Sequence, residues 1–191
     1  MSNTRIALVT LATAGLVLTG GAATAATKSV KDKSGDAAQV ADITKVTVDN
    51  GEDVLSIRVK LAKAKAGRTH LVATLTSPTE GGATYVARTV VLPRGNGNAP
   101  SNLPGNAHSN AGRIGATLEL VGAEDTEPAL VECDGIKATL SSGRKGQSSI
   151  RVPQVCFGDD AGTMLVEVAT VTPSGDEIAD EVPTTLRVKR G

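Results

Sequence analysis

The stretch that decides the fold is ITKVTVDNGEDVLSIRVKL, residues 43–61, in which two apolar-rich runs flank DNGED at 49–53. In the second run, Leu55, Ile57, Val59 and Leu61 occupy every second position, which places them on one face of a strand. An Asn-Gly pair between two such runs is a strong hairpin signal, because both central residues of a type I′ turn need positive φ. Residues 40–61 are therefore predicted to form a β-hairpin.

Segments with similar alternation follow along the chain at short intervals, with turn signals such as PTEGG at 78–82 between them. No segment after the first 25 residues shows a helical period. Short strands separated by turns are typical of a sandwich or barrel. The sequence therefore predicts an all-β fold, an antiparallel β-sandwich that is immunoglobulin-like in general architecture. The further candidate strands are residues 69–76, 83–92, 113–121, 129–134, 136–140, 148–152, 164–171 and 184–188.

One long interruption separates the predicted strands, PRGNGNAPSNLPGNAHSNAG at residues 93–112. A loop of this length in a compact domain is either functional or mobile. It offers few charged or apolar side chains to a partner, which favours a mobile loop.

The first 25 residues have the three parts of a secretory signal peptide. Arg5 gives a basic start, residues 6–18 (IALVTLATAGLVL) are uncharged, and Ala-Thr-Ala at 23–25 is a cleavage signal. The apolar run is shorter than the roughly 20 residues that span a membrane. We expect cleavage between Ala25 and Ala26, and a secreted, extracellular protein without a membrane span. The alternative is a buried helix of a cytosolic protein.

The rest of the chain divides into two parts. Residues 26–38 (ATKSVKDKSGDAA) are polar and without periodicity, so we expect a flexible polar leader. Residues 39–191 then form a single β-sandwich domain of ordinary length.

Charge and aromatic content argue against some functions. Twenty Lys and Arg balance 20 Asp and Glu, whereas binding to nucleic acid requires clustered cations. Tyr85 and Phe157 are the only aromatic residues. The core must therefore be filled by aliphatic side chains, and the aromatic platforms that stack on sugars or single-stranded nucleic acid are missing.

Cys133 and Cys156 are the only cysteines. For an exported chain we expect a disulfide, because two thiolates without nearby histidines leave the tetrahedral zinc shell incomplete. A redox-active pair would more often be spaced as C-x-x-C. The enclosed segment contains two strand candidates around SGRKG at 142–146, so the disulfide should hold the flanks of a hairpin.

Two sequence features carry a resemblance to known proteins. DITKVTVD at 42–49 leads into the second run of the hairpin, and Cys133 is followed by IRVPQVCFG at 150–158, where a cysteine comes just after a strand ending in V-P-x-x-C. Over most of residues 40–170 the chain resembles a group of small, secreted, uncharacterised actinobacterial proteins. The resemblance implies a β-sandwich with one disulfide and no assigned activity. The chain departs from that group in having so few aromatic residues.

His70 and His108 are the only candidates for an imidazole base. Nucleophilic catalysis needs a Ser or Cys beside a base, and the chain has no G-x-S-x-G motif. His70 lies on the polar face of the predicted strand 69–76, which indicates a solvated histidine, and His108 lies in the long loop. No catalytic residue is predicted, and a hydrolase with a site assembled from distant residues remains the alternative.

Two acidic segments could supply oxygen ligands to calcium, residues 49–53 and DDAGT at 159–163. Neither has the D-x-[DN]-x-[DN]-G spacing of an EF-hand loop, and Asp, Asn and Gly also favour turns. We interpret both as turns, and leave open a weak calcium site at Asp49 to Asp53 or at Asp159 and Asp160. No metal ligand and no cofactor is predicted.

Basic residues gather around the end of the predicted hairpin. They could contact anionic wall polymers, or they could protect a strand edge against aggregation. The acidic residues elsewhere in the chain favour the second interpretation. These residues are Arg58, Lys60, Lys63, Lys65 and Arg68.

We therefore predict a non-catalytic secreted protein, an envelope-associated or extracellular binding or structural module. Its expected partner is another protein or a cell-wall polymer, and not nucleic acid. A third hypothesis is a protein inhibitor that presents residues 93–112 to an enzyme, although no disulfide stiffens that loop.

Overall fold

The structure is a computed structural model that describes residues 26–91, 114–122, 127–172 and 177–191. The expected signal peptide, residues 93–112 and His108 lie outside the described residues. The elements are β1 (Ala26–Lys31), β2 (Ile43–Asn50), β3 (Val54–Leu61), β4 (Lys63–Ala64), β5 (His70–Thr76), β6 (Thr84–Val91), β7 (Ile114–Val121), β8 (Ala129–Leu130), β9 (Lys137–Ser141), β10 (Gly143–Arg144), β11 (Gln147–Pro153), the 3-10 helix η1 (Gln154–Asp160), β12 (Met164–Val171), β13 (Ile178–Glu181) and β14 (Leu186–Val188).

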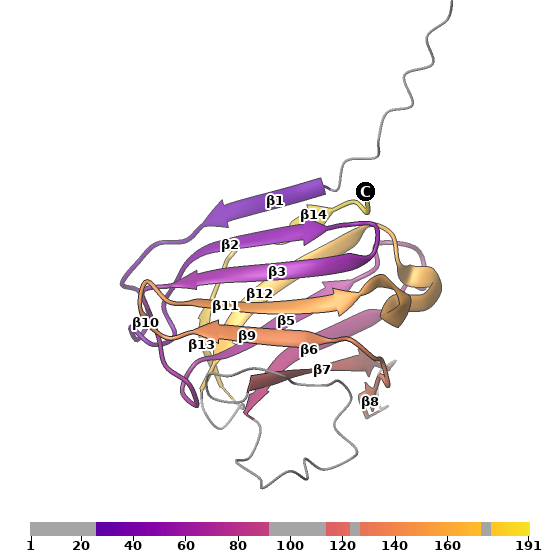
Figure 1. Cartoon of the computed structure of the whole chain (residues 1–191). Coiled ribbons are helices and arrows are strands. Elements are labelled where there is room, and N and C mark those ends of the chain that lie inside the picture. Colours follow the sequence, from indigo (N-terminus) through magenta and orange to yellow (C-terminus); the bar gives the residue numbers. More distant parts are fainter. Residues whose placement is uncertain (1–25, 92–113, 123–126, 173–176) are drawn as a thin grey trace, which may run out of the picture.

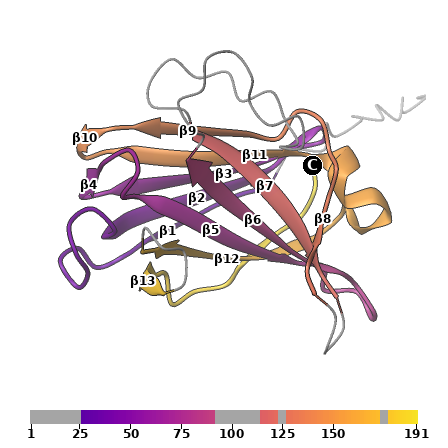
Figure 2. The same ribbon diagram turned by 90° about the horizontal axis from the view of Figure 1, so that it is seen from below.

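The strands form two antiparallel sheets that pack face to face (Figures 1 and 2). The first sheet has the order β1-β2-β3-β11-β9. The second has the order β13-β12-β5-β6-β7-β8, with β14 also paired to β12. A short ribbon, β10-β4, extends one end, and the sheets approach each other where β1 contacts β14 and β7 contacts β9. The predicted antiparallel β-sandwich is confirmed.

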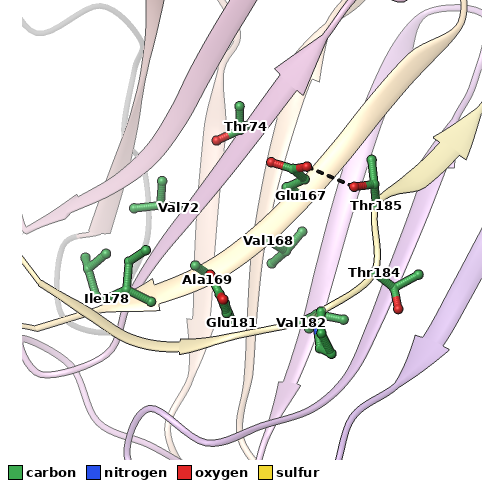
Figure 3. A pocket seen from close by; sticks show the side chains of 12 residues that line it. Val72, Thr74, Glu167, Val168, Ala169, Ile178, Glu181, Val182, Thr184 and Thr185 are labelled. Carbon is green, nitrogen blue, oxygen red and sulfur yellow. Dashed lines mark hydrogen bonds between the residues drawn. The ribbon is translucent and has the colours of Figure 1, made fainter.

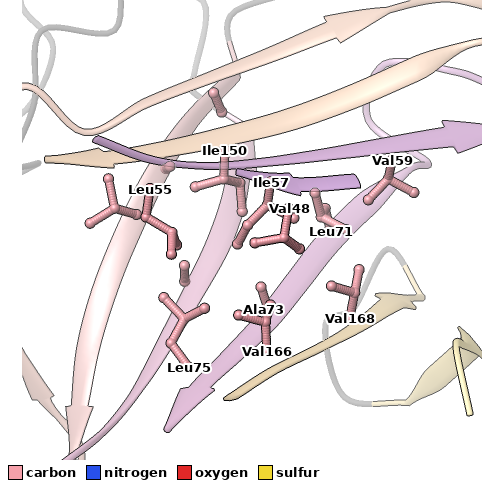
Figure 4. Packing of buried hydrophobic residues seen from close by; sticks show 14 of the residues in the cluster. Val48, Leu55, Ile57, Val59, Leu71, Ala73, Leu75, Ile150, Val166 and Val168 are labelled. Atoms are coloured by element: carbon pink, nitrogen blue, oxygen red, sulfur yellow. The ribbon is translucent and has the colours of Figure 1, made fainter. Parts of the chain in front are cut away.

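The core between the sheets is almost entirely aliphatic, as the composition requires. Alternate residues of β3, from Leu55 to Leu61, are buried and face Val166 and Val168 of β12 and the apolar residues of β5 (Figure 4). Each fully buried Val, Leu or Ile side chain contributes about 1.5–3 kcal/mol relative to exposure. None of the helices in the described ranges reaches the length and apolarity that a membrane span requires.

The predicted hairpin is confirmed as β2 and β3, but its turn is not the expected type I′. The last pair of the ladder is Asn50 with Leu55, and the Gly51 amide donates to the carbonyl of Val54 at 3.1 Å. Neither Asn50 nor Gly51 has a positive φ. Asn50 instead belongs to the strand, so the connection is Gly51 to Asp53.

The buried side chain of Asn50 explains why it stays in the strand. Its Nδ2 donates to the carbonyls of Gly162 at 2.8 Å and Val188 at 3.3 Å, and its Oδ1 accepts from Nε2 of Gln154 at 2.7 Å. A buried amide is stable only when such bonds are made. Asn50 therefore ties the first sheet to the C-terminal strand and to η1.

The N-terminal segment differs from the expected flexible leader. Ala26–Lys31 forms β1, which pairs along its whole length with β2, from Ala26 opposite Asn50 to Lys31 opposite Lys45. Val30 packs against the core, whereas the polar residues of β1 are exposed. One large apolar side chain is too weak a pattern to predict a strand, and pairing with β2 supplies the stability instead.

The cysteines form the expected disulfide, Cys133–Cys156, with a Cα–Cα distance of 5.6 Å. It joins the segment before β9 to η1, and it encloses the β9–β11 hairpin. Closing a loop of this length stabilises a chain by about 3 kcal/mol in the chain-entropy treatment. The strand predicted at 129–134 is limited to β8, because the chain turns at Asp134 and Gly135, whose φ is 87°.

Candidate functional site

The outer face of the first sheet is rich in polar and basic side chains. Outward residues share register across its five strands, so they form rows perpendicular to the strands. With strands about 4.8 Å apart, each row spans roughly 19 Å. We call this surface the cationic face, and its basic side chains are those of Lys31, Lys45, Arg58, Lys60, Lys137 and Arg151.

One row of the cationic face brings like charges together. Lys31 is the register partner of Lys45, and Lys45 is the partner of Lys60. In a second row, Arg151 stands opposite Lys137. Like charges directly opposite one another destabilise a sheet. An arrangement that costs stability is expected where a protein binds a ligand.

A β-bulge creates the lysine row. The register shifts between Ile43, which pairs with Leu61, and Lys45, which pairs with Lys60, so that Thr44 is the extra residue. The Thr44 hydroxyl donates to the carbonyl of Lys60 at 3.1 Å. Without the extra residue Lys45 would oppose a buried position of β3, so the bulge turns its ammonium group outward.

Most of the remaining outward side chains in these rows are polar, and the apolar Val54 and Pro153 stand opposite each other at one end of the face. Asp49 is the acidic residue of these rows, and it forms an ion pair with Arg58 at 3.9 Å. Thr139 and Ser149 hydrogen bond to each other at 2.7 Å. Hydroxyl groups between cations can hydrogen bond to the oxygens of an anionic polymer.

The basic run seen in the sequence lies only partly on this face. Arg58 and Lys60 belong to β3, which lies between β2 and β11, so the expected protection of a strand edge does not apply to them. Lys63, Lys65 and Arg68 are exposed at the end of the sheet near β4. The zero net charge gives no sign of this cluster of cations, because the pairing register of the strands, and not the overall composition, brings the cations together.

The two histidines have no shared site in the described residues. His70 is the first residue of β5 and pairs with Val171. Its half-buried side chain lies on the outer face of the second sheet. Among the described residues its imidazole has no hydrogen-bond or ion-pair partner. His108 lies outside them.

In the acidic segments 49–53 and 159–163, aspartate side chains accept hydrogen bonds from other parts of the fold. Asp49 accepts from the hydroxyl of Thr27 at 3.1 Å, and Asp160 accepts from the hydroxyl of Tyr85 at 3.2 Å. Within the described ranges, neither turn gathers three acidic or other ligand groups.

The two aromatic residues meet inside the sandwich. Tyr85 and Phe157 lie edge to face, with ring centroids 5.2 Å apart, and the Tyr85 hydroxyl also donates to the Phe157 carbonyl at 3.2 Å. Burial raises the pKa of Tyr85, and the charge and hydrogen bond of Asp160 raise it further. Both rings are buried, so neither offers a face for stacking on a sugar.

A groove of about 400 Å³ lies on the outer face of the second sheet (Figure 3). Both β13 and β14 pair with β12, and the groove lies where the segment between β13 and β14 separates from β12. A hydrogen bond of 2.8 Å from the Thr185 hydroxyl to Glu167 crosses the groove. Among the described residues, the lining includes Glu167 and Glu181 but no Lys, Arg or His. This groove is therefore of opposite charge to the cationic face.

An acidic cluster that the sequence did not predict joins the two sheets. Asp36 and Asp42 come from the connection between β1 and β2, and Asp180 comes from β13. Asp36 lies in the segment expected to be a flexible leader, whereas Asp42 lies at the start of the predicted hairpin and has no ligand-like spacing around it. No local pattern connects it with β13, since Ile43 and Asp180 are 137 residues apart in the chain.

Comparison of the chain with protein-family models, with curated proteins and with solved structures finds no match to any of them.

Proposed function

We propose that the protein is a non-catalytic, exported module that binds an anionic polymer of the cell envelope through the cationic face. The observation that carries this proposal is the row Lys31, Lys45 and Lys60, in which three ammonium groups stand opposite one another on adjacent strands. A polymer with regularly spaced phosphates would neutralise them and release counterions, which favours binding.

Other features support an extracellular setting. The sequence begins with a predicted signal peptide, and the Cys133–Cys156 disulfide is of a kind that persists in oxidising compartments. The resemblance to small secreted actinobacterial proteins points in the same direction and remains a prediction.

An envelope polymer fits this face better than nucleic acid does. Sequence-specific readers of duplexes insert a helix, strand or loop into a groove, whereas the cationic face is one side of a five-stranded sheet that carries hydroxyl groups and cations. Binding to single strands relies on stacking with aromatic side chains, and both aromatic residues of this chain are buried.

The alternative function is an extracellular hydrolase. It would require a histidine beside a nucleophile and a carboxylate in a pocket. Within the described residues His70 has no hydrogen-bond partner and does not line the groove of the second sheet. The described contacts therefore favour binding over catalysis.

The direct test compares the protein with a Lys45→Gln/Lys60→Gln variant in binding to a purified glycerol-phosphate polymer at several salt concentrations. We expect about tenfold weaker binding, equivalent to about 1.4 kcal/mol. The slope of log K against log salt should fall by about one for each lysine removed. The matched control is Arg187→Gln/Lys189→Gln, which removes two exposed charges outside the cationic face.

Stability separates loss of binding from loss of fold. The substitutions relieve like-charge contacts, so the free energy of unfolding of the variant should not fall. We expect it to rise by about 0.2–1 kcal/mol in denaturant unfolding. Unchanged binding by the variant would reject the proposal. Tighter binding of duplex DNA than of the phosphate polymer would also reject it.

A further inference from the structure

Acidic side chains from the β1–β2 connection and from β13 meet where β13 lies beside the start of β2. Asp36, Asp42 and Asp180 each contribute one carboxylate oxygen, and these oxygens all lie within 4.8 Å of one another. Oxygens that bind the same calcium ion at about 2.3–2.6 Å can be up to roughly 5 Å apart. A single cation can therefore bridge the three carboxylates.

The burial of Asp42 is an independent observation that indicates a missing ligand. The residue is 2% exposed. Its Oδ2 accepts from the Gly35 amide at 2.9 Å, but its buried Oδ1 has no hydrogen-bond partner among the described residues. Within the same ranges, no Lys or Arg forms an ion pair with any of the three carboxylates. A buried carboxylate is stable only with hydrogen bonds or a positive charge beside it.

Asp32 adds a fourth carboxylate beside the cluster, near Asp180. The Ile43 amide donates to the Oδ2 atom of Asp180 at 2.6 Å, and the carboxylates of Asp32 and Asp36 lie close enough to interact with that of Asp180. The Oδ2 atom of Asp32 is also buried and lacks a partner in the described part of the chain.

The fold holds the connection in place before any ion binds. The hydroxyl of Thr170 on β12 donates to the Ala41 carbonyl at 2.8 Å. Together with the bond from Ile43 to Asp180, this fixes the residues on both sides of Asp42 against the second sheet. Asp36 is exposed, so an ion can reach the cluster from solvent.

We propose that Asp36, Asp42 and Asp180 bind one calcium ion. Their hard oxygen ligands suit calcium, which takes six to eight such ligands, and water or backbone carbonyls would complete the shell. The ion would fasten the β1–β2 connection to β13, and so join the two sheets. This site does not depend on the cationic face or on the function proposed for it.

The test is calorimetric titration of calcium chloride into the purified protein after removal of metals with a chelator. We expect one site per chain, with a Kd of about 10⁻⁴–10⁻³ M, as in extracellular calcium modules. At ten times that concentration, Tm should rise by about 3–6 °C.

The variant Asp36→Asn should bind calcium at least tenfold more weakly. Asp36 is exposed and has no hydrogen bond in the described part of the chain, so its substitution should leave the fold intact. Asp134→Asn, at an exposed acidic residue outside the cluster, is the matched control and should bind as the unmodified protein does.

Three results would overturn the inference. The first is no heat of binding and no change of Tm at millimolar calcium in the unmodified protein. The second is equal affinity in Asp36→Asn. The third is an equal rise of Tm with sodium chloride of the same ionic strength, because screening and not coordination would then be responsible.

Discussion

At the scale of single residues, the buried Tyr85 makes the stability of the fold depend on pH. Its hydroxyl is buried between the Phe157 carbonyl and the Asp160 carboxylate. Tyrosine is neutral when protonated, so a raised pKa means that the folded state holds this proton more tightly than the unfolded chain does. The resulting stabilisation is complete below the unfolded pKa of about 10, and it is lost as pH rises through the higher folded pKa.

We predict that Tyr85→Phe weakens this alkaline loss of stability. Near neutral pH the variant should be less stable by about 0.5–1.5 kcal/mol, because it lacks the hydroxyl hydrogen bonds. Above pH of about 10, the difference between the two proteins should shrink, since only the unmodified protein has the Tyr85 proton to lose. Urea unfolding at a series of pH values measures this difference.

The absorbance of tyrosinate provides a direct check, because Tyr85 is the only tyrosine and the chain has no tryptophan. Asp160→Asn should lower the pKa of Tyr85 towards its ordinary value, whereas Asp159→Asn should change it little. Titration of folded Tyr85 at the pKa of a free tyrosine would contradict the described contacts.

At the scale of elements, β1 is the strand whose role is most open to test. Val30 packs against the core, and its neighbour Ser29 is exposed. Val30→Asp should therefore lower the free energy of unfolding by about 1–3 kcal/mol, because it places a carboxylate against apolar side chains. Ser29→Asp is the matched control, with an expected change within about 0.5 kcal/mol. Equal effects of the two substitutions in denaturant unfolding would show that β1 does not pair with β2 as described.

Most of the central strands could be predicted from the sequence because their alternation reflects burial of one face. The bulge at Thr44 also left a signal, since the apolar residues Ile43 and Val46 are three positions apart before the alternation resumes at Val48. The turn after Asn50 could not be predicted, because the side-chain partners of Asn50 come from distant segments.

The candidate sites were much less predictable than the strands. The row of lysines requires pairing of β1, which has one apolar side chain to indicate it, and the register shift in β2. The acidic cluster requires Asp180 on a four-residue strand to meet a segment near the N-terminus. Both sites depend on long-range pairing, which local propensity does not encode.

At the scale of the whole molecule, a chain of zero net charge gathers cations on one sheet face. The first sheet presents the cationic face, whereas the second carries the groove with Glu167 and Glu181. Such a distribution orients a protein towards an anionic surface, and its effect weakens as salt increases. The calcium ion proposed at the edge between the sheets would hold both halves of this arrangement together.

The measurement that tests the proposed binding face most directly is an NMR titration of the isotope-labelled protein with the glycerol-phosphate polymer. Chemical shifts should change for outward residues of β2, β3, β11 and β9, centred on Lys45, Lys60 and Arg151, and they should return towards the free values at high salt. Changes concentrated instead around Glu167 and Glu181 on β12 and β13, with the first sheet unaffected, would contradict binding through the cationic face.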